Sequence, residues 1–294
     1  MKILVLGAAG MLGHKMFQTL RQRFPETFAT VRGKATDQAY GNIDLLQHGN
    51  VIENVDVLDQ ATLADRLRLL RPDFIVNCIG IIKQRSAAHA HLPSIAINSL
   101  LPHQLTELCG SWGGRLIHFS TDCVFSGKQG NYSEEDASDA EDLYGKSKFL
   151  GEVQAPNALT LRTSIIGREL SEFKSLLEWF LGQKDPSVRG FTRALYSGVT
   201  TNFLSRFVGD VIADHPELQG LYQVTSPTIS KHDLLCLLRQ AYGLPTRIVA
   251  DDSFSCDRSM RGDKLKAAVG YECPAWPVLC ADLANDPTPY ERWR

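Results

Sequence analysis

The sequence has no long apolar run, no paired cysteine motif and no excess of positive charge. No stretch approaches the ~18 consecutive apolar residues that a membrane-spanning helix requires. The 31 Lys and Arg residues are balanced by 33 Asp and Glu residues, so no basic surface for nucleic acid or an anionic membrane is expected. The seven cysteines include no C-x-x-C pair, which argues against a disulfide framework and a zinc knuckle. We therefore expect a cytoplasmic protein that binds neither nucleic acid nor membranes.

The histidines give no pattern typical of a metal site. His89 and His91 are two residues apart, so they would not share one face of a helix, and no third ligand is evident. No bound metal ion is therefore expected.

The first half of the chain alternates apolar runs of strand length with helical periodicities. Ile3 to Leu6 is expected to form a buried strand, and the apolar spacing from Leu12 to Phe24 predicts a helix that covers it. Further strands are expected at 28–31, 51–55, 74–78, 115–120 and 158–163, and helices over 63–70, 98–109 and 143–153. Such alternation is typical of βαβ units, whose right-handed crossovers give a doubly wound parallel sheet, the Rossmann fold.

Beyond Gly167 the pattern becomes less regular. Helices are expected over 172–181 and 203–214, a strand over 221–224, and a helix that begins at Ser230, where Ser230 and Asp233 fit a capping box. We predict an α/β protein with the Rossmann domain over residues 1–167. Residues 168–294 are predicted to form mainly a smaller, mixed α/β lobe, with some segments returning to the first domain.

A glycine-rich loop, Gly7-Ala-Ala-Gly10-Met-Leu-Gly13, lies between the first expected strand and helix. A dinucleotide pyrophosphate would rest there on the helix N-terminus. One glycine is needed to turn the chain, one to let the backbone approach phosphate, and one to let helix and strand pack closely. The loop, including Met11 and Leu12, is therefore predicted to bind a dinucleotide. The alternative is a glycine-rich turn that binds nothing.

Arg32 follows the second expected strand, where a site specific for NAD would carry Asp or Glu. A guanidinium would pair with the 2′-phosphate of NADP and an acid would repel it, so Arg32 favours NADPH, with NADH still possible. A solvated loop arginine is the alternative. Asp56, after the third strand, is a candidate to bind the adenine amino group, although a surface aspartate fits nearly as well. These residues predict that residues 1–167 form an NADP-binding domain.

Tyr144-Gly-Lys-Ser-Lys148 places a phenol and an ammonium on one face of an expected helix. A tyrosine with a pKa of about 10 is a poor acid–base catalyst near neutrality, and we expect Lys148 to lower that pKa. Ser120-Thr121-Asp122 ends a buried strand at the sheet edge where ligands bind. A hydroxyl there would hydrogen-bond a substrate carbonyl.

Together these features resemble the extended short-chain dehydrogenase/reductase superfamily, and within it the dTDP-4-dehydrorhamnose reductase (RmlD-like) branch. The resemblance extends over nearly the whole chain, and its specific parts are the Ser-Thr-Asp-x-Val-Phe segment and the Tyr/Lys pair. The matching positions are the glycine loop, Asn77, Asn98, residues 120–127, Tyr144 to Lys148, Gly151-Glu152 and Leu161 to Ser164.

The resemblance implies a catalytic triad of Thr121, Tyr144 and Lys148. It implies NADPH-dependent reduction of the keto group of a nucleotide-linked 4-keto-6-deoxy sugar, in deoxysugar or surface polysaccharide biosynthesis. Tyr144 would donate the proton, Thr121 would orient the carbonyl, and Lys148 would bind the nicotinamide ribose. A homodimer is a candidate assembly. The other expected site residues are Asn77 toward the cofactor, and Asp122, Cys123 and Arg193 toward the nucleotide-sugar substrate.

Cys123 departs from that branch, which usually has tyrosine at this position. A related branch, the epimerase-reductases that make GDP-fucose, has an acid–base cysteine there, paired with a histidine beyond the strand equivalent to residues 158–163. Residues 168–181 contain no histidine, so a buried thiol that fills space is the favoured interpretation. Two alternatives to the reductase stay open: an epimerase-reductase that uses Cys123, and a non-catalytic cofactor-binding subunit such as that of methionine adenosyltransferase assemblies.

Overall fold

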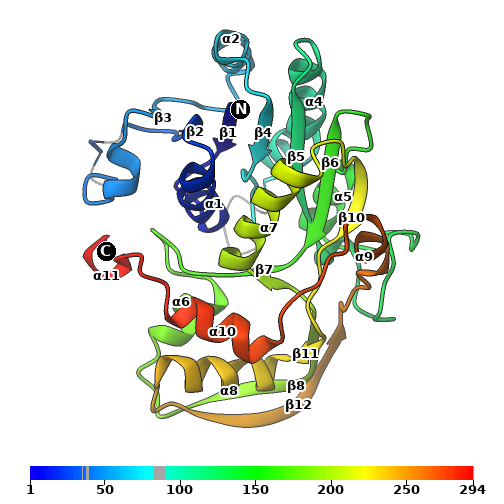
Figure 1. The fold of residues 1–294 in the computed structure, drawn as a ribbon. Helices are drawn as coiled ribbons and strands as arrows, with labels where there is room; N and C mark the ends of the chain where they lie inside the picture. The colour runs from blue at the N-terminus through cyan, green and yellow to red at the C-terminus, as the bar shows by residue number, and fades with distance from the viewer. Residues whose placement is uncertain (35, 38–39, 83–89, 294) are drawn as a thin grey trace.

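The computed structural model describes residues 1–34, 36–37, 40–82 and 90–293. Its centre is a seven-stranded sheet in the order β10-β6-β5-β4-β1-β2-β3, in which every pair of neighbours is parallel (Figure 1). The chain runs outward from β1 to one edge and then crosses over to build the other half, which confirms the doubly wound Rossmann fold. The strands are β1 (Ile3–Leu6), β2 (Thr27–Thr30), β3 (Val51–Ile52), β4 (Phe74–Asn77), β5 (Arg115–Thr121), β6 (Ala158–Thr163) and β10 (Gly220–Gln223).

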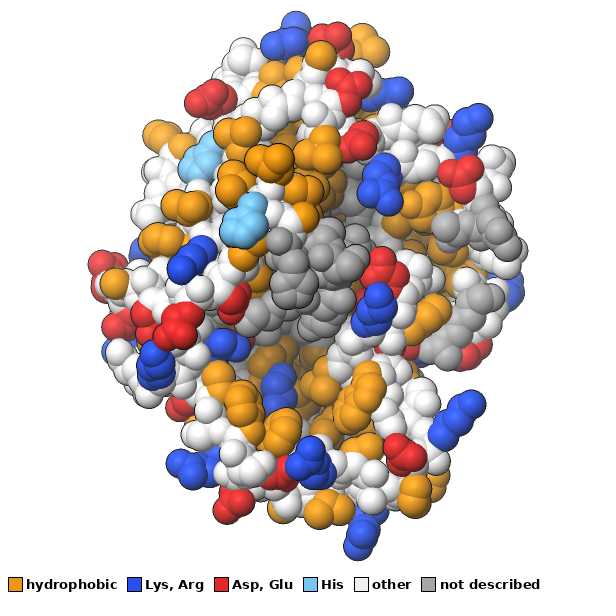
Figure 2. Space-filling model, turned by 180° about the vertical axis from the view of Figure 1, so that it is seen from behind, with side chains coloured by type: hydrophobic (Ala, Val, Ile, Leu, Met, Phe, Trp, Pro, Cys, Tyr) orange, Lys and Arg blue, Asp and Glu red, His pale blue; other side chains and the backbone are white. Residues whose placement is uncertain are grey.

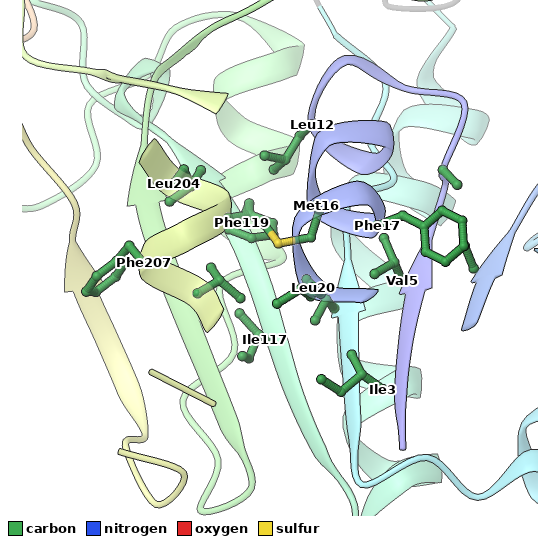
Figure 3. Close-up of a cluster of buried hydrophobic side chains, with 14 of the residues drawn as sticks. Ile3, Val5, Leu12, Met16, Phe17, Leu20, Ile117, Phe119, Leu204 and Phe207 are labelled. Atoms are coloured by element: carbon green, nitrogen blue, oxygen red, sulfur yellow. The ribbon is translucent and has the colours of Figure 1, made fainter. Parts of the chain in front are cut away.

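Helices cover both faces of this sheet. Ile3 and Val5 of β1 face α1 (Met11–Arg23) and α7 (Thr201–Asp214), and Figure 3 shows Met16 and Leu20 of α1 packed among these side chains. The alternate residues Leu4 and Leu6 point to the other face, toward α2 (Gln60–Leu70) and α4 (Leu101–Gly110). Burying one such side chain contributes about 1.5–3 kcal/mol to folding. The two apolar layers hold the strand ends, and thus the ligand-binding edge, in place.

A smaller lobe is built on a three-stranded sheet in the order β11-β8-β12. β8 (Ser187–Tyr196) pairs in parallel with β12 (Arg247–Asp257) and antiparallel with β11 (Ile229–Ser230). The helices α6 (Leu176–Leu181), α8 (Lys231–Tyr242) and α10 (Trp276–Ala284) pack with it around a second apolar core. Ser230 caps α8, as predicted, by accepting a hydrogen bond from the Asp233 amide at 3.0 Å. The mixed α/β character of this lobe is therefore confirmed.

Two short strands lie where the chain passes between these sheets. β7 (Ile165–Ile166) follows β6 and pairs in parallel with β9 (Val199–Thr200), which leads directly into α7. Both α7 and β10 belong to the layers of the central sheet although they come after residue 167. The division of the chain at residue 167 stays a prediction.

Local backbone geometry moves several element boundaries away from the predicted ones. The third strand stops at Ile52 because Asn54 has a φ of 56°, a left-handed conformation incompatible with a strand. The helix expected over 172–181 begins only at Leu176, since Glu172 and Phe173 also have positive φ angles, 67° and 50°. The helix expected over 143–153, α5 (Leu143–Leu150), ends at Leu150 with Gly151 as its C-cap.

The helix expected over 98–109 is part of a longer segment with three helix types. α3 (His91–Ser94) leads into the π-helical η3 (Ile95–Leu100), and this into α4. Pro102, in the first turn of α4, has no N–H to donate to a carbonyl four residues earlier. This missing donor accounts for the change in backbone hydrogen-bond spacing between η3 and α4.

The sequence patterns missed six elements near the C-terminus and in the small lobe: β8, β11, β12, α9 (Asp263–Val269), α10 and α11 (Tyr290–Trp293). β12 lies at a sheet edge and is largely exposed, so it lacks the alternation of apolar and polar residues that marks a half-buried strand. Within the described residues, no helix is long and apolar enough to cross a membrane.

Candidate active site

A pocket of about 360 Å³ lies where the carboxyl ends of β1, β4, β5 and β6 face the small lobe. Ligands bind at this edge of open parallel sheets. The surface is hollowed between the part that holds the large sheet and the part that holds the small one (Figure 2). The central sheet and its helices contribute Gly10 to Leu12, Asn77, Thr121 to Cys123, Tyr144 and Lys148 to the pocket wall, and the chain beyond β6 contributes Glu169, Ser175, Tyr196 and Lys231.

The glycine loop has the geometry that the sequence predicted for a phosphate-binding turn. Gly7 has a φ of +83°, which L side chains rarely adopt, and a Cβ on Gly13 would overlap the Gly7 carbonyl. Gly10 is the N-cap of α1 and offers no side chain to its amides, so the first turn of the helix is left open toward the pocket. These features fit the pyrophosphate of a dinucleotide.

Asn77 and Asn98 shape the loop after β4. The Asn77 side chain accepts a hydrogen bond from the Ile79 amide at 3.1 Å and contacts the His118 ring at 3.2 Å. Asn98 accepts from the Ile81 amide at 2.9 Å and donates to the Ile81 carbonyl and to Ser147. Asn77 thus borders the pocket as predicted, whereas Asn98 ties the pocket loop to α5.

Thr121 and Tyr144 are brought together by close packing of α5 on the turn after β5. A Cβ on Gly145 would overlap the Cys123 carbonyl, so glycine at this position allows the contact. Thr121 ends β5 and accepts a hydrogen bond from the Cys123 amide at 3.1 Å. Burial raises the pKa of Tyr144, which a hydrogen bond with Thr121 opposes in part. Tyr144 is therefore held as a neutral phenol beside Thr121.

Lys148 lies in the pocket, but it does not lower the pKa of Tyr144 as the sequence predicted. Its ammonium donates a 2.6 Å hydrogen bond to the Phe119 carbonyl and lies 3.4 Å from Nε2 of His118. Burial lowers the pKa of Lys148 to about 8, against the attraction of Glu152. The correction has a physical reason: burial disfavours the charged form of both groups, and for Tyr144 only the hydrogen bond with Thr121 opposes this rise in part.

His118 and Lys231 are among the groups of the site that reasoning from the sequence missed. His118 is buried and links Asn77 to Lys148, and burial holds its pKa well below the ordinary value, so the ring is neutral. Lys231 reaches the pocket from α8, with its ammonium 3.6 Å from the centroid of the Tyr196 ring. One signal existed: a lysine in the first turn of a helix opposes the helix dipole, so such a placement suggests another role.

Besides Gly7 and Gly13 of the glycine loop, three predicted site residues lie outside this pocket. Arg32 is exposed in the loop after β2, where Asp37 accepts a hydrogen bond from the Lys34 amide at 2.7 Å. Asp56 is exposed and accepts from the Leu58 amide at 2.9 Å. Arg193 is exposed on β8, away from the pocket wall, so the structure gives no support to its predicted contact with substrate.

None of the seven cysteines, all of which are described, forms a disulfide, and Cys123 lines the pocket together with Asp122. Among the described residues, no group of three His, Cys, Asp or Glu side chains is placed to hold a metal ion. His89 lies outside the described residues, and His91 begins α3.

Fold and pocket together define the class of protein: a Rossmann enzyme of the short-chain dehydrogenase/reductase type, with its Tyr-x-x-x-Lys helix beside the strand that carries Thr121. Residues 1–250 match the family described as RmlD substrate binding domain. The chain belongs to this family, and the resemblance seen in the sequence is confirmed. It is thus an NAD(P)-dependent oxidoreductase of the dTDP-4-dehydrorhamnose reductase type.

The individual relatives have low sequence identity to this chain. The chain is 25% identical over 257 residues to the spore coat polysaccharide biosynthesis protein SpsK of Bacillus subtilis, covering 85% of this chain and 82% of that protein. It is 22% identical over 258 residues to the methionine adenosyltransferase 2 subunit beta of Danio rerio, covering 83% and 75%. A dTDP-4-dehydrorhamnose reductase of Bacillus anthracis, solved with NADP, superposes with a TM-score of 0.77 at 18% identity over 96% of this chain and 98% of that one.

Proposed function

We propose that this protein reduces the 4-keto group of a nucleotide-linked 4-keto-6-deoxy sugar with NADPH. The observation that carries the proposal is the single pocket shared by the glycine loop, Thr121, Tyr144 and Lys148. A dinucleotide held at the glycine loop and a ketone held at Thr121 would meet within it. NADH is the alternative coenzyme.

The residues present fit a dinucleotide cofactor, which would supply the hydride when bound. Gly7, Gly10 and Gly13 would hold its pyrophosphate at the N-terminus of α1. Arg32 would pair with the 2′-phosphate. Lys148, fixed by the Phe119 carbonyl, would donate further hydrogen bonds to the ribose beside the nicotinamide.

Tyr144 would act as the general acid of the reduction. Proton donation requires the phenol in its neutral form, and burial raises the pKa of Tyr144 so that this form dominates near neutrality. Thr121 Oγ1 lies beside this phenol and would orient the carbonyl toward it. The alkoxide formed at the reduced carbon would take the proton from Tyr144.

The sugar nucleotide as substrate is inferred from the relatives. SpsK is named for polysaccharide biosynthesis, and the solved relative is a dTDP-4-dehydrorhamnose reductase. We place the activity in deoxysugar or surface polysaccharide biosynthesis, in the cytoplasm, where seven cysteines without a disulfide suit a reducing environment.

The test is consumption of NADPH, followed by its absorbance, against a panel of dTDP-, UDP- and GDP-linked keto sugars. We expect turnover of a 4-keto-6-deoxyhexose and an alcohol at C4 in the product by NMR. Thr121→Val removes the hydroxyl at nearly constant volume, so it serves as the matched variant that lacks one group of the proposed site. Absence of turnover with every member of the panel would falsify the proposal.

The epimerase-reductase alternative rests on Cys123, which borders the pocket. Epimerisation requires proton exchange at a carbon next to the ketone, and inversion requires a second acid–base group on the other face of the ring. We predict that turnover in deuterated water leaves these carbons unlabelled and that Cys123→Ser keeps most of the activity. Deuterium that appears in the wild-type product and vanishes with the serine variant would support the alternative instead.

The regulatory-subunit alternative is favoured by one observation, the likeness to methionine adenosyltransferase 2 subunit beta. A purely regulatory subunit would bind the cofactor without turnover of any keto sugar. The presence of Thr121, Tyr144 and Lys148 in one pocket supports a catalytic function over a purely regulatory one.

A further inference from the structure

The small lobe offers the pocket one cation, and nothing in the reduction proposed above requires it. Lys231 is the first residue of α8, and its side chain lies over the Tyr196 ring at 3.6 Å from the centroid. Among the described residues Lys231 forms no ion pair, and it lines the pocket together with Asp122 and Cys123. Lys231 is partly buried, and a cation that loses water without gaining an ion-pair partner is costly, so a ligand group that accepts a hydrogen bond from it would bind favourably.

A second polar group in the wall of the same pocket is also left for a ligand. Ser175 is 9% exposed and lines the same pocket, and its hydroxyl has no hydrogen-bond partner among the described residues. Its backbone amide donates to Glu169 at 2.9 Å, which fixes the residue in the wall. Buried hydroxyls in proteins are almost always hydrogen-bonded, so an unpaired one in a pocket indicates a ligand that completes it.

The position of Lys231 identifies the part of the substrate that it would meet. Its charge interacts with Asp122 and Cys123, the two residues that follow Thr121. Thr121 marks the reacting carbonyl under the proposed function, so a group beside these residues lies at the hexose and not at the distant base. The hydroxyls of a hexose accept hydrogen bonds from ammonium groups.

We propose that Lys231 is a specificity-determining residue that donates a hydrogen bond to the hexose of the nucleotide-linked substrate, with Ser175 as a second polar group of the same pocket. This inference rests on the proposed function for the identity of the ligand. It assigns recognition of the sugar to the small lobe and the chemistry to the central sheet.

The experiment compares Lys231→Met with Lys264→Met. Lys264 also lies over a tyrosine ring, 5.0 Å from the centroid of Tyr222, but it is outside the pocket, so it is a matched control. A lost hydrogen bond to a charged group corresponds to about a 10- to 150-fold loss of affinity. We expect the KM for the keto sugar nucleotide to rise by this factor in Lys231→Met, with the affinity for NADPH and for free dTDP or UDP unchanged. Lys231→Arg should restore part of the loss, and Lys264→Met should match the wild type.

A pH profile gives an independent readout. Burial lowers the pKa of Lys231 to about 8, although Asp122, Cys123 and Cys256 oppose the shift, and the Tyr196 ring faces the ammonium. The wild-type KM should therefore rise above about pH 8 as the ammonium loses its proton. Lys148 titrates in the same range, but it is present in both proteins, so the difference between wild type and Lys231→Met isolates Lys231.

Other outcomes would overturn the assignment. An unchanged KM in Lys231→Met would rule out the contact with the hexose. An equal loss of affinity for free dTDP or UDP would place the contact at the diphosphate. A loss confined to kcat would make Lys231 part of the chemical step. If no keto sugar is turned over, calorimetry with reduced dTDP- and UDP-deoxysugars decides. Binding that depends on Lys231 would uphold the inference while the proposed function fails, and no binding would overturn both.

Discussion

At the scale of single residues, the proposed reduction depends on the proton of Tyr144. Tyr144→Phe removes the hydroxyl and keeps the ring, and general acid catalysis typically contributes about 10²- to 10⁴-fold. We expect kcat to fall by a factor in this range, equivalent to about 3–5 kcal/mol of barrier. Steady-state kinetics measure the loss, and fluorescence titration with NADPH should give an unchanged dissociation constant. Full activity in the variant would remove Tyr144 from the mechanism.

For Arg32 we predict a separate role, in the choice between coenzymes. A charge-assisted contact to the 2′-phosphate is worth about 1.5–3 kcal/mol, or roughly 10- to 150-fold in affinity. NADPH should therefore bind more tightly than NADH, and Arg32→Asp should abolish or reverse this order, as measured by titration with both coenzymes. Lys34→Asp, two residues away in the same exposed loop, is the control for a general change of charge. Equal dissociation constants in the wild type would contradict the role of Arg32.

At the scale of elements, the C-terminal segment is attached to α1 by buried polar groups. His14 lies within 2.9 Å of both the Gly10 carbonyl and the Tyr290 hydroxyl, so the ring connects the glycine loop to α11. Lys15 forms a 2.5 Å ion pair with Asp286, and both side chains are almost fully buried. The first helix therefore depends on residues at the far end of the chain for its position.

We predict that Lys15→Met destabilises the protein by about 3–5 kcal/mol, because it leaves the Asp286 carboxylate buried without its partner. Arg23→Met on the same helix is the control, since Arg23 pairs with Asp210 on the surface and such pairs contribute about 1 kcal/mol or less. Denaturant unfolding of the three proteins measures both differences. Equal losses for the two variants would show that burial of the Lys15 pair has no special weight.

The same pair predicts a pH dependence of stability. Burial alone would raise the pKa of Asp286, but Lys15 and Thr288 outweigh it, and the net shift is downward. A carboxyl whose pKa is lower in the folded state stabilises the fold above its ordinary value near 3.8 and loses this contribution as the pH falls further. Unfolding measured from pH 6 to pH 3 should therefore show a smaller decline in Lys15→Met than in the wild type.

At the scale of the whole molecule, an apolar face suggests self-association. The exposed large side chains of α3, η3 and α5 include Leu92, 82% exposed, and Leu150, 61% exposed, and hydrophobic side chains gather on the face shown in Figure 2. Contiguous apolar surface is typical of interfaces. We expect a homodimer in solution, with a mass by light scattering of twice the 32.6 kDa of the chain.

The double variant Leu92→Glu with Leu150→Glu should shift the protein to a monomer. Leu69→Glu is the control, because Leu69 is 90% exposed but belongs to α2 and not to α3, η3 or α5. A wild-type mass of one chain would rule out the homodimer.

The sequence alone determined the parts of this protein that depend on local spacing. The strand-glycine-helix order of residues 3 to 23 and the four-residue spacing of Tyr144 and Lys148 are set by neighbours in the chain, since strands and helices repeat every 2.0 and 3.6 residues. Because parallel strands end at one edge of the sheet, Asn77 and Thr121 could also be placed together before the structure was known.

Only the tertiary structure decided which distant residues complete the pocket and how its groups ionise. Lys231 and Ser175 reach it through packing of the small lobe, which no local pattern encodes, and β12 is exposed enough to show no periodicity at all. The direction of the Tyr144 shift was wrong from sequence because the pKa depends on burial as well as on the nearest charge. The burial of a side chain such as Tyr144 depends on contacts from the whole fold, so it is determined only when the lobes are packed together.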